Sequence, residues 1–63
     1  MSRWKRDMAF VKKEFPGAWW NRNRRTIEGY SESLYLGHGY YEQDAWMDAA
    51  TQIRRLRKRM VKA

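Results

Sequence analysis

The fold is decided by residues 42–61, EQDAWMDAATQIRRLRKRMV, the longest stretch of the chain with the periodicity of a single helix. Apolar side chains recur along it at intervals of three and four residues, which is the spacing of one helix face. Acidic residues lie near its start and basic residues near its end, an order that the helix dipole favours. The stripe that predicts a buried face consists of Ala45, Ala49, Ile53, Leu56 and Met60, flanked by Trp46 and Ala50.

A second helix is predicted over residues 2–15, where Ser2 is expected to act as the cap. Pro16 and Gly17 end this pattern, because the residue before a proline is disfavoured in the α region and glycine permits a turn. The apolar face of this helix would consist of residues spaced by four, three and four positions, namely Trp4, Met8, Val11 and Phe15. Trp4 and Trp46 are therefore expected in the core.

Between the helices, short segments rich in aromatic and β-forming residues predict three strands, at residues 18–21, 25–30 and 33–36, with turns at 22–24 and 31–32. Residues 37–39, GHG, are interpreted as a break before the long helix. Alternation along the strands gives a core-like face with Ile27, Gly29, Leu34 and Leu36. The opposite face would be polar and aromatic, with Thr26, Glu28, Tyr30 and Tyr35.

These patterns predict a small α+β domain of order α-β-β-β-α, in which a three-stranded antiparallel sheet packs on a long C-terminal helix. Its 63 residues suit one domain, residues 1–63, with a small core. The chain has no cysteine and one histidine, so neither a disulfide framework nor a zinc site is expected. No apolar run suits a membrane span or a secretory signal, and we expect a cytoplasmic protein.

The formal net charge of +7 favours polyanionic partners. Lysine and arginine are confined to residues 1–25 and 54–63, whereas residues 26–53 contain acids and no Lys or Arg. Two basic clusters result, one in the turn after the first strand and one at the end of the long helix. Their members are Arg22, Arg24 and Arg25, and Arg54, Arg55, Arg57, Lys58, Arg59 and Lys62.

Residues 17–50 resemble the DNA-binding domains of the AP2/ERF type and their relatives in phage integrases. The resemblance rests on GAWW at 17–20, NRNRR at 21–25, YLG at 35–37 and the alanines of the long helix. It implies that the exposed sheet face lies in the DNA major groove while the helix packs behind the sheet. By position, the residues that would face DNA are Arg22, Arg24, Thr26, Glu28, Tyr30 and Tyr35.

The order of elements is also similar to that of double-stranded-RNA-binding domains, with Gly37 and Gly39 followed by Ala45, Ala49 and Ala50. That family holds phosphate with lysines at the start of its last helix. The present chain has Glu42, Gln43 and Trp46 there. The resemblances therefore favour DNA over RNA.

The first hypothesis is a small basic nucleic-acid-binding protein that contacts duplex DNA through the sheet face and the basic turn. The candidate binding residues are Arg22, Arg24, Arg25, Thr26, Tyr30, Tyr35, Arg54, Arg55, Lys58 and Arg59. The alternative is a protein-interaction module, such as an inhibitor or adaptor of the kind that phage genomes encode, with Trp19, Trp20, Tyr40 and Tyr41 as interface residues. Trp19 and Trp20 are adjacent, so one would point inward and one outward. An N-terminal helix lying across the sheet face would favour this alternative.

Catalysis is not expected from this sequence. His38 has no partners at the spacing of a catalytic triad and is interpreted as a flexible turn residue. Glu42, Asp44 and Asp48 lack a calcium-binding loop and are interpreted as charges that stabilise a helix N-terminus. We therefore expect no enzyme, no cofactor, no metal and no small-molecule ligand. Membrane binding by the basic helix ranks last, because its alanine-containing stripe suits packing on a sheet.

Overall fold

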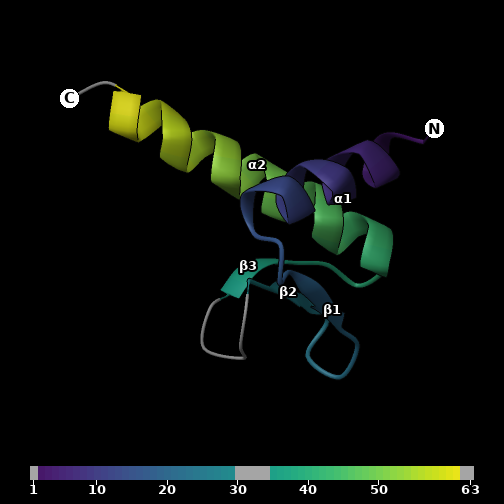
Figure 1. Ribbon diagram of the computed structural model, residues 1–63. Coiled ribbons are helices and arrows are strands. Elements are labelled where there is room, and N and C mark those ends of the chain that lie inside the picture. The colour runs from purple at the N-terminus through teal and green to yellow at the C-terminus, as the bar shows by residue number, and fades with distance from the viewer. Residues whose placement is uncertain (1, 30–34, 62–63) are drawn as a thin grey trace.

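The computed structural model describes residues 2–29 and 35–61, and the side chains of residues 59–61 are outside that description. It contains helix α1 (Arg3–Glu14), strands β1 (Trp19–Asn21), β2 (Thr26–Glu28) and β3 (Tyr35–His38), and helix α2 (Glu42–Val61). The α+β class and the α-β-β-β-α order are thus confirmed (Figure 1). No helix in the described part of the chain is long and apolar enough to cross a membrane.

Both helices follow the sequence pattern closely. Helix α2 begins at Glu42 and ends at Val61, as predicted. Helix α1 is held at its start by the backbone of Ser2, whose carbonyl accepts hydrogen bonds from the amides of Lys5 and Arg6, both at 3.2 Å. The Ser2 side chain makes no capping hydrogen bond. Ser2 is therefore the cap residue, as predicted, and its backbone carbonyl rather than its side chain closes the first turn.

The sheet has the order β1-β2-β3 and is antiparallel throughout. Ile27 pairs with Trp20 on one side and with Gly37 on the other. A bulge follows, because Glu28 pairs with Tyr35, which leaves Leu36 as the extra residue on β3. This bulge keeps both Ile27 and Leu36 in the core, although simple alternation does not explain their shared burial.

The third strand differs from its prediction. It continues through Gly37 to His38, whereas the sequence pattern ended it at residue 36. Gly37 is part of the strand because this strand lies directly on α2: a Cβ at this position would be 2.5 Å from the Ala49 amide nitrogen. Glycine here permits close packing and does not break the strand. The predicted turn at 31–32 and the predicted face positions of Tyr30 and Leu34 lie outside the described residues.

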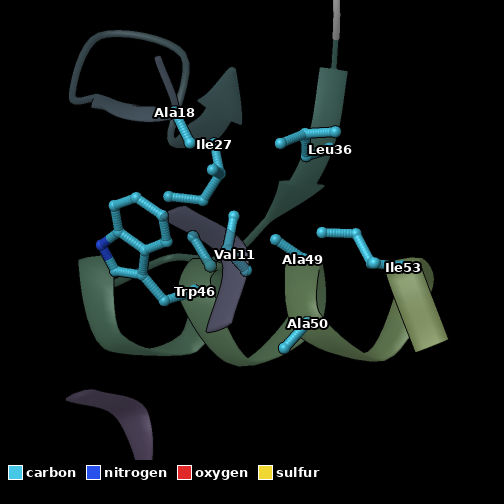
Figure 2. Packing of buried hydrophobic residues seen from close by; sticks show 9 residues of the cluster. Val11, Ala18, Ile27, Leu36, Trp46, Ala49, Ala50 and Ile53 are labelled. Atoms are coloured by element: carbon cyan, nitrogen blue, oxygen red, sulfur yellow. The ribbon is translucent and has the colours of Figure 1, made fainter. Parts of the chain in front are cut away.

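The core lies between the sheet and the two helices. Helix α2 packs on β3 and β2, and α1 packs on α2, so both helices lie on the same side of the sheet (Figure 1). Figure 2 shows the Trp46 indole between α2 and two residues on the sheet side, Ala18 just before β1 and Ile27 of β2, with Val11 of α1 beside it. The buried apolar residues are Val11, Ala18, Ile27, Leu36, Ala45, Trp46, Ala49, Ala50 and Ile53.

Four members of the predicted apolar stripes are less buried than expected, since Met8 and Phe15 are half-buried as well as the two residues described next. Trp4 is only half-buried and packs at the edge of the core. Leu56 has 56% of its surface exposed, because the C-terminal half of α2 projects beyond the sheet (Figure 1). A periodic stripe shows which residues share a helix face, but the extent of the partner layer decides how much of that face is covered.

Candidate nucleic-acid interface

The sheet face that points away from the helices is not covered by either of them (Figure 1). Strand alternation and the bulge at β3 define its members. Each strand contributes two polar or aromatic side chains: Trp19 and Asn21 from β1, Thr26 and Glu28 from β2, and Tyr35 and His38 from β3. The register places Trp19 and Tyr35 beside Glu28, and Asn21 and His38 beside Thr26. We call this surface the open face. The sequence prediction of a polar and aromatic face is confirmed for Thr26, Glu28 and Tyr35.

The turn between β1 and β2 holds the first basic cluster. Arg22, Arg24 and Arg25 are all exposed there, and the turn points away from the helices (Figure 1). Asn21 Oδ1 accepts a hydrogen bond from the Arg24 amide at 3.3 Å, and the Gly39 amide donates one to the Arg25 carbonyl at 3.1 Å. These bonds fix the turn to its own strand and to the end of β3.

Arg25 has an unusual backbone conformation. Its φ of 56° makes it the only non-glycine residue with positive φ among those described. The sequence prediction began the second strand at Arg25, and this was wrong because the hairpin closes through a left-handed residue at that position. A non-glycine side chain in this region costs roughly 1–2 kcal/mol. Glycine or asparagine would close the same turn with less strain.

The Arg25 guanidinium lies 4.0 Å from the centre of the Tyr40 ring. This is a close cation–π contact, which holds a long side chain in one orientation. The two residues border a shallow hollow of about 540 Å³ at the edge of the open face. The residues lining it are Arg24, Arg25, Thr26, Tyr35, His38, Gly39 and Tyr40.

His38 is held in place on β3, contrary to the expectation of a flexible turn. Asp48 of α2 accepts a hydrogen bond from the His38 amide at 2.9 Å, and the same carboxylate oxygen lies 3.6 Å from His38 Nδ1. The Tyr35 hydroxyl and His38 Nδ1 form a hydrogen bond. Partial burial raises the pKa of Tyr35, and the negative charges of Asp48 and Glu28 raise it further. Tyr35 therefore remains neutral at physiological pH.

Glu28 is the one acidic side chain in the middle of the open face, yet only 1% of its surface is exposed. Its Oε1 accepts a hydrogen bond from the Thr26 hydroxyl at 2.8 Å. Its Oε2 has no hydrogen-bond partner among the described residues. The carboxylate therefore lies beneath the surface, where a ligand would not contact it directly, although its charge still acts on Tyr35.

The second basic cluster is divided by the tertiary structure. Arg54 pairs with the buried carboxylate of Asp7 at 3.2 Å, and its guanidinium lies 4.6 Å from the centre of the Phe10 ring. Arg57 pairs with Glu14 at 2.8 Å. Both arginines therefore connect α2 to α1, a role that the sequence interpretation missed because the partners are far apart in the chain.

The other members of that cluster remain exposed or outside the description. Arg55 and Lys58 are exposed, and no acid pairs with them in the part of the chain that the structure describes. The side chain of Arg59 and the whole of Tyr30 lie outside the described residues. Among the aromatic candidates, Trp19 is 38% exposed on the open face whereas Trp20 packs against the core, which confirms the predicted alternation.

No protein-family model, curated protein or solved structure matches the chain. The class of the protein therefore follows from its own fold and site alone. It is a small α+β domain in which two helices cover one face of a three-stranded sheet. The other face is polar and aromatic, and exposed arginines border it.

Proposed function

We propose that this protein binds nucleic acid on the open face of the sheet, with duplex DNA as the favoured ligand. One observation carries the proposal: Arg24 and Arg25 of the turn after β1 and Tyr40, which follows β3, border a single hollow at the edge of that face. Guanidinium groups bind phosphate in a bidentate manner, and aromatic rings beside them provide stacking surfaces. The net charge of +7 would draw a polyanion towards this surface.

The shape of the domain supports duplex DNA. Strands β1 and β2 form a two-stranded ribbon with the arginine-rich turn at its tip, and the major groove admits a ribbon of this kind. Both helices lie on the opposite side of the sheet, so they leave the approach to the ribbon open (Figure 1). The resemblance to AP2/ERF-type domains implies the same face. Arg55 and Lys58, on the projecting part of α2, would attract phosphate outside the groove.

The salt dependence of binding tests the proposal. If three or four phosphates are neutralised, the affinity for duplex DNA should fall roughly 40- to 150-fold between 50 and 200 mM salt, since the slope is about −0.9 per phosphate. Fluorescence anisotropy with random-sequence duplex DNA, duplex RNA and single strands measures this directly. A preference for duplex RNA would contradict the choice of DNA, and the absence of binding to every ligand at low salt would refute the proposal.

A substitution at Arg25 separates binding from stability. Arg25→Gly relieves the left-handed strain and loses the contact with Tyr40, so the free energy of unfolding should stay within about 1 kcal/mol of the original. The affinity for DNA should fall roughly tenfold or more, because a charged hydrogen bond to phosphate contributes about 1.5–3 kcal/mol. Anisotropy and urea denaturation give the two values.

The matched control for this change is Arg6→Ala. It removes the same charge from an exposed position on α1, in the helical layer behind the sheet. Its effect on affinity should be less than about twofold, since exposed charges beyond a Debye length of ~10 Å are largely screened. Equal losses for the two variants would mean that net charge alone matters and that the open face is not the binding surface.

One observation favours a second candidate function, a protein-interaction module. An apolar groove of about 460 Å³ lies between the end of α1, strand β3 and the projecting part of α2. Phe15, Leu36, Ile53 and the exposed Leu56 line it. Exposed leucine in a concave surface is typical of sites that accept an apolar side chain of a partner. This function would become the preferred one if the titration detects no nucleic-acid binding.

A further inference from the structure

Tyr40 and Tyr41 connect β3 to α2, and they are the most exposed of the large apolar side chains in the described part of the chain, at 64% and 62%. Their ring centres are 4.9 Å apart and their planes are inclined by 75°. Two rings in this edge-to-face arrangement form a corner. A flat ligand can stack on one ring while its rim meets the other.

The backbone beneath this corner is fixed. The Tyr41 carbonyl accepts a hydrogen bond from the Ala45 amide at 3.1 Å, and the Gly39 amide donates to Arg25. A Cβ at Gly39 would be 2.6 Å from the Ala45 amide nitrogen, so the segment after β3 is in close contact with the first turn of α2. The two exposed rings therefore project from a rigid support, which lowers the entropic cost of binding to them.

A positive charge lies directly beside the corner. The Arg25 guanidinium covers the Tyr40 ring at 4.0 Å, and Arg24 borders the same hollow. A ligand that uses both features must combine a flat ring with a nearby negative group. A nucleotide has this combination, because its base stacks on aromatic side chains and its phosphate pairs with arginine.

We propose that Tyr40 and Tyr41 form a seat for one unpaired nucleobase, whose phosphate is held by Arg25. This inference rests on the proposed function and narrows its ligand class. Inside a duplex both faces of every base are stacked on neighbours, so only a base in an overhang, a bulge or a flipped position can enter the seat. The preferred ligand is therefore duplex DNA with an unpaired nucleotide next to it.

The experiment compares fluorescein-labelled DNA hairpins that share one stem and are closed by a flexible polyether linker, which replaces the loop nucleotides so that no unpaired base is present outside the overhang. The first is blunt, the second carries a short overhang, and the third carries an abasic overhang with the same phosphates and no bases. The overhang is tested in both its 3′ and its 5′ forms. The hairpin with a base-containing overhang should bind about tenfold more tightly than the abasic one, as expected for one stacked base. The comparison uses the unaltered protein and so does not depend on the folding of a variant.

Variants of Tyr41 assign the effect to the seat. Tyr41→Ala should reduce the affinity for the base-containing overhang to that for the abasic one and leave the blunt hairpin unaffected. Tyr41→Phe, which keeps the ring, should retain the preference. Equal binding of base-containing and abasic overhangs, or an equal loss on all hairpins with Tyr41→Ala, would overturn this inference and leave the proposed function intact. Absence of binding to any hairpin at low salt would overturn both.

Discussion

Gly37→Ala is expected to lower the free energy of unfolding by about 3 kcal/mol or more, at or beyond the upper end of the usual cost of overpacking. A Cβ at position 37 would be 2.5 Å from the Ala49 amide nitrogen and 2.7 Å from its Cα. Both atoms belong to the backbone of α2, so no side chain can rotate away to make room. A domain of this size has a total stability of only about 3–9 kcal/mol, so a loss of about 3 kcal/mol would remove between a third and all of it.

The control is the same substitution at Gly17. This glycine lies in an exposed turn and has no positive φ, so alanine should change the stability by less than about 1 kcal/mol. Urea denaturation followed by tryptophan fluorescence compares the two variants. A stability for Gly37→Ala close to that of Gly17→Ala would show that β3 and α2 are not in close contact, and the position of the open face would then have to be revised.

Trp46→Ala is expected to cost about 3–5 kcal/mol, the range for removing a buried tryptophan. Only 1% of Trp46 is exposed, and its ring separates α2 from Ala18 and Ile27 (Figure 2). Its Nε1 also donates a hydrogen bond to Glu42 Oε2 at 3.0 Å, which fixes the first turn of the helix. Loss of the near-ultraviolet circular dichroism signal and a lower denaturation midpoint would report the change.

Two substitutions separate the parts of this effect. Trp46→Phe keeps an aromatic ring and loses the hydrogen bond and some volume, so it should cost roughly half as much. Trp19→Ala removes the same side chain from the open face, where it is 38% exposed, and should cost clearly less than Trp46→Ala. Equal destabilisation by the two alanine variants would contradict the placement of Trp19 on the open face and of Trp46 in the core.

The sequence alone predicted the elements whose signals are local. The bounds of α2 agreed with the prediction because its periodicity continues over many turns and its charges match the dipole. Strand alternation predicted that one of the adjacent residues Trp19 and Trp20 points outward and the other inward, and the structure shows that Trp19 is the outer one. The end of β3 was placed incorrectly because Gly37 carries the same local signal in a turn and in a strand that packs tightly on a helix.

The candidate site was predictable only in part. The sequence named Arg24, Arg25 and Tyr35 as candidates for nucleic-acid binding but Tyr40 as a candidate for a protein interface. Their place around one hollow depends on the hydrogen bond from the Gly39 amide to the Arg25 carbonyl, which joins two turns. The strained φ of Arg25 has no sequence signal of its own, because a left-handed position is usually marked by glycine or asparagine.

The amino-acid sequence by itself determined the helices, the presence of three strands, the inner face of the sheet and the positive charge, because each depends on neighbours within a few residues. The tertiary structure decided which basic residues are free and which face is open. In the folded protein Arg54 forms an ion pair with Asp7, and the Arg25 guanidinium lies against the Tyr40 ring. The physical reason is that these contacts join segments far apart in the chain: the pair of Arg54 and Asp7 depends on the packing of α1 on α2, and the contact of Arg25 with Tyr40 lies next to Gly39, whose backbone packs closely on the start of α2.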